Sequence, residues 1–213
     1  MLNVSTEPAL KELKRLNINF TPVEFLANLE SRDIANVTLF LAAGMDPNTK
    51  TTDGVPALHL AVQHPANDLA KLLLDYTAEI NATDKRNWTA LMLTAKKGDT
   101  ALADFLLSRG ANPNIQTAAF SWTALIFATH NNHLEIVKLL LDKGAEINST
   151  TIFNETALMF AARNGYPEIA KLLIDKKAVL NAQDRYGWTA LKFATQKNHP
   201  ALVQLLQAAG AKE

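Results

Sequence analysis

The sequence predicts an all-α chain, a solenoid built from repeated helix–turn–helix units. Three observations support this prediction. A segment of the type WTALMLTAKKG recurs along the chain, its copies are 33 or 34 residues apart, and the leucines between copies are spaced as on one face of a helix. The copies begin at Val55, Trp88, Trp122, Glu155 and Trp188. A repeat of this length is typical of solenoids, in which each unit contacts only its neighbours.

Each repeat contains the signals for a short helix followed by a longer one. A threonine that can cap the first helix with its hydroxyl stands at Thr89, Thr123, Thr156 and Thr189. A glycine stands where the second helix has to stop in a left-handed turn, at Gly110, Gly144 and Gly210. Asparagines keep the same period, at Asn48, Asn81, Asn114, Asn148 and Asn181. We expect the leucines of the first helix to lie in the core, namely Leu91, Leu125, Leu158 and Leu191.

This pattern resembles the ankyrin-repeat family, whose repeat opens with T-[PA]-L-x-x-A and closes with L-L-x-x-G-A-x-x-N. Five full repeats cover residues 51–83, 84–117, 118–150, 151–183 and the C-terminal 184–213. Residues 20–50 resemble a capping repeat, and residues 1–19 a half-hairpin cap with Leu10, Leu13 and Leu16 on one helical face. Residues 1–213 would then form a single domain. The resemblance implies an ankyrin-repeat solenoid with projecting β-hairpin fingers, whose fingertips and first helices line a concave face.

The repeat at residues 51–83 departs most from the family pattern. Pro56 stands where the capping threonine is expected, Pro65 where glycine is usual, and Thr77 replaces the stop glycine. A β-branched residue in a left-handed conformation costs about 1 kcal/mol or more. We therefore expect residues 51–83 to be the weak link of the array. Further glycine replacements are Lys177 at a stop position, and Asn87, Asn154 and Ser121 in fingers, the last beside one inserted residue.

The repeat register divides the aromatic residues into two groups. One group shares a position inside the first helix and is expected to form a core ladder: Phe127, Phe160 and Phe193. The other group shares two finger positions, and the resemblance implies that these contact a partner: Trp88, Trp122, Trp188, Phe120, Phe153 and Tyr186. Aligned aromatic side chains at a surface are typical of an interface. The alternative is that each tryptophan lies flat on the neighbouring finger and helps to stack the array.

The same register predicts a positively charged concave face. Its basic residues are Lys85, Arg86, Lys96, Lys97, Arg163, Arg185 and Lys197. Its acidic residues are Asp53 and Glu155, although lysine plus arginine and aspartate plus glutamate both total 21 in the whole chain. We expect a groove that is aromatic and basic. The alternative is that these are ordinary solvated charges.

Composition excludes several classes of function. The chain has no cysteine, which rules out disulfides, thiolate metal sites and cysteine nucleophiles. No P-loop, GxSxG or HExxH motif is present. His130 and His133 are spaced HxxH without a further ligand, and His59 resembles the family's structural histidine. No apolar stretch reaches the roughly 18 residues of a membrane span. We expect a cytoplasmic monomer that is no enzyme and has no cofactor, metal site or membrane segment.

These observations favour a protein-interaction module or scaffold, whose groove binds an acidic protein partner with hydrophobic anchors. The alternative is recognition of a nucleotide or a short single-stranded nucleic acid, because aromatic platforms beside lysine and arginine suit base stacking and phosphate contact. The zero net charge argues against nucleic acid.

Overall fold

The computed structural model describes residues 6–64 and 67–212. They fall into two compact units, Met1–Lys85 and Arg86–Glu213, which we call unit 1 and unit 2. The regular secondary structure of the described residues is almost entirely helical, so the predicted fold class is confirmed. The organisation of residues 1–213 as a single domain stays a prediction. Within the described ranges, no helix is long and apolar enough to cross a membrane.

Unit 1 contains five described helices: α1 (Glu7–Arg15), α2 (Pro22–Ser31), α3 (Ile34–Ala42), α4 (Ala57–Ala61) and α5 (Asp68–Asp75). Helix α1 packs on α3, α2 packs on α3 and α4, and α4 packs on α5. The N-terminal segment is therefore helical, as expected, but its leucines are not all covered. Leu13 is buried, whereas Leu10 and Leu16 are exposed. Residues three apart drift around a helix, so Ala9 rather than Leu10 shares the buried face with Leu13.

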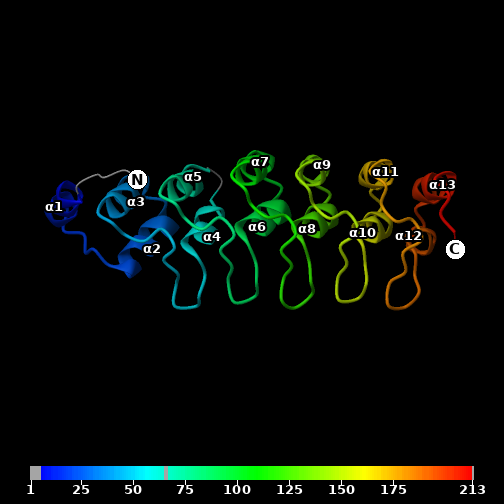
Figure 1. Cartoon of the computed structure of the whole chain (residues 1–213), viewed down its shortest axis with the longest axis horizontal. Helices are drawn as coiled ribbons and strands as arrows, with labels where there is room; N and C mark the ends of the chain where they lie inside the picture. The colour runs from blue at the N-terminus through cyan, green and yellow to red at the C-terminus, as the bar shows by residue number, and fades with distance from the viewer. Residues whose placement is uncertain (1–5, 65–66, 213) are drawn as a thin grey trace. The chain divides into compact units, whose positions relative to one another are not determined.

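Unit 2 contains four helical hairpins: α6 (Ala90–Lys97) with α7 (Thr100–Ser108), α8 (Ala124–His130) with α9 (Leu134–Asp142), α10 (Ala157–Asn164) with α11 (Pro167–Asp175), and α12 (Ala190–Gln196) with α13 (Pro200–Ala208). The first helices pack on one another in an inner row, and the second helices form an outer row. The loops between repeats extend from the inner row, away from the outer helices (Figure 1). The four leucines predicted for the core are buried.

Helix starts follow the predicted capping scheme. The hydroxyl of Thr89 accepts a hydrogen bond from the backbone N–H of Met92, and the other three predicted threonines make the same contact. Pro56 offers no side-chain cap, and α4 is only five residues long. The inner helices of unit 2 have seven or eight residues. The missing cap is consistent with the shorter helix.

Helix ends confirm the predicted left-handed turns. Thr77 and Lys177 both have a φ of 68°, although each carries a side chain. The finger residues Asn87, Ser121 and Asn154 have φ values between 54° and 60°. The other conflict expected in residues 51–83, at Pro65, lies outside the described residues. The prediction that this repeat is the weak link stays a prediction.

The fingers of unit 2 are tight turns in which no regular strand is assigned among residues 86–212. The backbone N–H of Thr151 donates to the carbonyl of Glu155, and Asp184 donates in the same way to Trp188, each over 3.0 Å. In the finger with the inserted residue, Thr117 donates to Trp122, so the turn spans one residue more. Neighbouring fingers are joined by single backbone hydrogen bonds, from Ala118 to Arg86, from Ile152 to Phe120 and from Arg185 to Phe153.

The periodic asparagines connect each repeat to the next. The side-chain oxygen of Asn114 accepts a hydrogen bond from the backbone N–H of Glu146. The same contact recurs from Val179 to Asn148, from Lys212 to Asn181 and, in unit 1, from Glu79 to Asn48, over 2.7 to 2.9 Å. Backbone donors need a partner, and these asparagine side chains supply one at exposed positions where no strand does.

Candidate functional site

Tryptophans of the unit 2 fingers pack onto phenylalanines of the inner helices. The ring centroids of Trp88 and Phe127 are 4.5 Å apart, those of Trp122 and Phe127 5.0 Å, and those of Trp122 and Phe160 5.1 Å. Each of these two tryptophans therefore contacts the phenylalanine of the next repeat. The tryptophans are half-buried, while Phe127 and Phe160 are buried as predicted. Two adjacent finger tryptophans thus share one buried phenylalanine between them.

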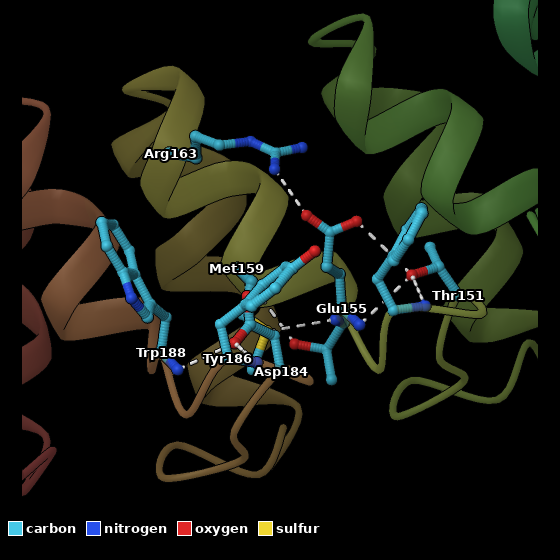
Figure 2. Close-up of polar contacts among 9 residues, drawn as sticks. Thr151, Glu155, Met159, Arg163, Asp184, Tyr186 and Trp188 are labelled. Carbon is cyan, nitrogen blue, oxygen red and sulfur yellow. Dashed lines mark hydrogen bonds and ion pairs between the residues drawn. The ribbon is translucent and has the colours of Figure 1, made fainter.

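The aromatic row is interrupted where the repeat carries Glu155 instead of tryptophan. Arg163 donates a hydrogen bond to the Glu155 carboxylate (Figure 2). Its guanidinium lies 4.6 Å from the ring of Phe160 and 5.5 Å from that of Phe193. The other Glu155 oxygen accepts from the hydroxyl of Thr151. A planar guanidinium stacks well on an aromatic face. Arg163 therefore covers the two phenylalanines that a tryptophan would otherwise contact.

A cavity of about 420 Å³ opens between the first two fingers of unit 2. We call it the aromatic pocket, and its lining residues are Arg86, Trp88, Lys96, Thr117, Ala119, Phe120, Trp122, Phe127, His130 and Asn131. The guanidinium of Arg86 lies 5.6 Å from the Trp88 ring and the Lys96 ammonium 5.4 Å from it. Phe120 at the rim is 54% exposed. No lining residue is acidic, so the pocket combines aromatic walls with positive charge.

His130 adds a ring to the aromatic pocket without adding a charge near neutral pH. Its ring lies 5.2 Å from that of Trp122 and 5.8 Å from that of Phe160. Burial lowers the pKa of His130, the positive charge of Arg163 lowers it further, and Glu155 opposes the shift. Since an ordinary histidine has a pKa of about 6.5, a lowered value keeps this ring neutral at pH 7.

A second cavity of about 410 Å³ lies at the other end of the same row of fingers, and we call it the Tyr186 pocket. It is lined by Glu155, Arg163, Asp184, Tyr186, Trp188 and Phe193. Asp184 is buried, and its carboxylate accepts hydrogen bonds from the backbone N–H groups of Tyr186 and Trp188 (Figure 2). Trp188 packs on Phe193 at 5.1 Å. The carboxylates of this pocket are thus engaged in holding the finger and Arg163.

The structure brings eight of the thirteen predicted site residues into these two cavities. Arg86, Trp88, Lys96, Phe120 and Trp122 line the aromatic pocket, and Arg163, Tyr186 and Trp188 line the Tyr186 pocket. Of the remaining five, the guanidinium of Arg185 lies 5.3 Å from the ring of Phe153. Lys97 and Lys197 are exposed at the ends of α6 and α12 and line neither cavity, and Lys85 belongs to unit 1.

Several residues that the structure places in the cavities are not among the thirteen predicted site residues. Phe127 was assigned to the core alone, although its ring also forms part of the aromatic pocket. His130 and Asn131 follow Phe127 closely on α8 and its C-terminal end. Glu155 is predicted only as an acidic residue of the concave face. It replaces tryptophan in the recurring motif, and this replacement was the feature of the sequence that could have indicated the ion pair with Arg163.

Stacked helical hairpins with turn-like fingers define a repeat protein of the helical-solenoid class. A family model described as ankyrin repeats in three copies matches residues 24–117, 78–151 and 125–212. The chain therefore belongs to the ankyrin-repeat family. Proteins of this family generally mediate protein–protein interactions and are generally non-catalytic.

Similar proteins come from distant organisms. An ankyrin repeat-containing protein of Treponema pallidum is 34% identical over 122 residues, which cover 57% of this chain and 41% of that protein. Human transient receptor potential cation channel subfamily A member 1 is 28% identical over 161 residues, covering 56% of this chain and 14% of the channel. The mouse B-cell lymphoma 3 protein homolog is 29% identical over 137 residues, covering 62% and 30%. The matched region is less than half of each relative.

Proposed function

We propose that this chain is a non-catalytic interaction module that binds a segment of a partner protein at the finger side of unit 2. The aromatic pocket carries the proposal. It offers two tryptophans and an exposed phenylalanine beside two cations, within a cavity of about 420 Å³. Tryptophan and arginine are the residue types that most often dominate the energy of protein interfaces.

The proposed partner is acidic and carries hydrophobic anchors. Burial of an apolar side chain against the aromatic walls would make binding more favourable, and the two cations would attract carboxylates next to that side chain. The basic residues Lys85, Lys97, Arg185 and Lys197 would act at the rim, where charges mainly raise the association rate. The proposal includes a monomer that works as a cytoplasmic scaffold without a cofactor, and the lack of cysteine suits a reducing compartment.

The test is a selection of random displayed peptides on the purified chain. We expect enriched peptides to combine an apolar residue with aspartate or glutamate. Trp122→Ala should weaken binding of such a peptide about thirtyfold or more, because a buried aromatic anchor contributes about 2 kcal/mol. Lys138→Ala and Lys171→Ala on the outer helices α9 and α11 serve as controls and should leave the affinity unchanged.

Trp122 also contacts three rings of the protein, so its removal needs a companion variant. The double variant Arg86→Ala, Lys96→Ala removes two positive charges from the aromatic pocket and leaves all of its aromatic side chains in place. It should slow association and flatten its dependence on salt. If the outer-helix variants weakened binding and the pocket variants did not, the partner would bind elsewhere.

Recognition of single-stranded nucleic acid is the competing function, because Trp88 with its two neighbouring cations could stack a base beside a phosphate. The aromatic pocket holds two strong cations, whereas a nucleic-acid backbone is usually bound through many phosphate contacts. Fluorescence anisotropy with labelled oligothymidine at low salt decides between the two functions. Tight binding there, without any enriched peptide, would overturn the protein-partner proposal.

A further inference from the structure

We propose that the aromatic pocket is a charge-selective anchor site, which takes one large apolar side chain flanked by carboxylates and rejects an anchor flanked by cations. The inference rests on the proposed function, since it names the chemistry of the partner segment at that site. It also assigns different ligand preferences to the aromatic pocket and the Tyr186 pocket, which lie at corresponding places in the repeat. Only the aromatic pocket would accept the anchor.

The shape of the aromatic pocket suits a single large side chain. Its volume of about 420 Å³ is at the lower end of the range of about 300–1,000 Å³ that is usual for ligand cavities. Trp88 and Trp122 form the walls, and both rings contact Phe127, which is itself 6% exposed. Walls supported by a buried ring lose little conformational entropy on binding. The pocket is therefore preorganised for an apolar group.

The charges around the aromatic pocket exclude a cationic anchor. An empty aromatic cage attracts ammonium groups to the ring faces. Here the ring of Trp88 already has the Arg86 guanidinium at 5.6 Å and the Lys96 ammonium at 5.4 Å. No carboxylate lines the cavity to neutralise an incoming cation. The neutral ring of His130 adds no negative charge either. A further positive charge would be repelled, whereas a carboxylate would meet two cations.

The Tyr186 pocket has a similar size but the opposite electrostatic character. It contains Glu155 and Asp184, and Arg163 is already paired with Glu155. Lys192 does approach Trp188, with its ammonium 5.0 Å from the ring, but it does not line the cavity. The lining of the Tyr186 pocket therefore has two carboxylates against one guanidinium, a net negative charge that disfavours an acidic segment. The two ends of the finger row differ in charge, which gives an acidic segment a single preferred anchor site.

Three matched peptides test the inference: acetyl-Asp-Phe-Asp-amide, acetyl-Lys-Phe-Lys-amide and acetyl-Asp-Ala-Asp-amide. The protein is labelled with 5-fluorotryptophan and observed by fluorine NMR. Its three tryptophans give three signals, each assigned by a Trp→Phe variant. We expect the acidic phenylalanine peptide to shift the Trp88 and Trp122 signals and to leave Trp188 unmoved. It should bind about tenfold or more tightly than either of the other two peptides.

Two charge variants give the matched control. Lys96→Gln should reduce the preference for the acidic over the basic peptide about fivefold, because one of the two cations is removed. Lys192→Gln removes a lysine placed in the same way over Trp188 and should leave the preference unchanged. The unshifted Trp188 signal reports in each Lys96 sample that the protein is folded.

Four results would overturn the inference: equal or tighter binding of the basic peptide, equal binding of the alanine peptide, a dominant shift of Trp188, or no shift of any signal. Equal effects of the two lysine variants would also overturn it, because they would reveal only long-range charge. Failure of the proposed function looks different. The peptide selection would then yield no binder, even though the acidic phenylalanine peptide still shifts Trp88 and Trp122.

Discussion

Arg163, near the end of the inner helix α10, reaches back along the helix to Glu155, which lies just before its start. Arg163 takes over the packing role that tryptophan has in the neighbouring repeats. Glu155 occupies the motif position of Trp88, Trp122 and Trp188, and its side chain is 13% exposed, while that of Arg163 is 29% exposed. The guanidinium covers Phe160 and Phe193. An ion pair thus replaces an aromatic ring without leaving the phenylalanine ladder uncovered.

The Glu155–Arg163 pair should contribute measurably to the stability of unit 2. A double-mutant cycle of Glu155→Ala and Arg163→Ala, followed by chemical denaturation, should give a coupling free energy of about 1 kcal/mol. Lys171 and Asp175 form the control pair, because their side chains are 64% and 59% exposed. Their coupling should be about 0.3 kcal/mol. Equal couplings would contradict the idea that partial burial strengthens the first pair.

Gly98 should tolerate a methyl group less well than Gly144 does. Both have left-handed backbones, with φ of 89° and 86°, so either change to alanine costs about 1 kcal/mol of stability. At Gly98 an added Cβ would also stand 2.5 Å from Cε1 of His133, whereas Gly144 has open space. His133 would have to move and lose the contact of its Nε2 with the Lys96 carbonyl at 3.2 Å.

We therefore expect Gly98→Ala to lower the free energy of unfolding by about 1 kcal/mol more than Gly144→Ala does. In a His133→Ala background the two glycine variants should cost the same, since the obstructing ring is gone. A difference that persisted without His133 would point to another cause. Denaturant titration of the five variants measures this.

Replacing Thr77 with glycine should stabilise unit 1. Thr77 has a φ of 68°, which is unfavourable for a β-branched residue and acceptable for glycine. Glycine also raises the conformational entropy of the unfolded chain, which offsets part of the relieved backbone strain. The free energy of unfolding should therefore rise by about 0.5–1 kcal/mol in all. Tyr76→Gly at the preceding position, where φ is −90°, should destabilise instead. Thermal melts of the two variants provide the measurement, and a lower melting temperature for Thr77→Gly would disprove the expectation.

His59 should make unit 1 less stable in mild acid. Burial lowers its pKa, while the hydrogen bond of Nε2 with the Ala82 carbonyl and the charge of Asp84 oppose the shift, and Lys50 adds to it. The unfolded chain takes up a proton below about pH 6.5, but the folded chain resists protonation until a lower pH. The stability from the neutral ring is therefore present above about pH 6.5 and is lost as the pH falls towards the folded pKa.

The free energy of unfolding should fall less steeply in His59→Gln than in the wild type between about pH 7 and pH 5. The difference in slope should be up to about 1 kcal/mol per pH unit. Denaturant unfolding at several pH values measures the slope. His130→Gln gives a parallel test in unit 2, because the pKa of His130 is lowered as well. If the wild type and His59→Gln showed the same slope, burial of His59 would not be the cause.

The sequence by itself determined the repeat and its local structure. The period placed the helices, the hydroxyls of Thr89 and its counterparts identified the helix starts, and the left-handed turns at Thr77 and Lys177 followed from the missing glycines. These features depend on backbone sterics and on hydrogen bonds within a few residues, so a linear pattern carries them. The buried phenylalanines followed in the same way from helical periodicity.

Only the tertiary structure decided which of the predicted site residues meet. Six aromatic residues shared two motif positions, yet Trp88 and Trp122 line one cavity and Trp188 another, while Phe153 instead lies beside Arg185. The difference arises from Arg163, which covers two phenylalanines because Glu155 holds it. Such contacts join side chains of different repeats and depend on their rotamers. Identical motif positions therefore acquired different neighbours, and with them different chemistry.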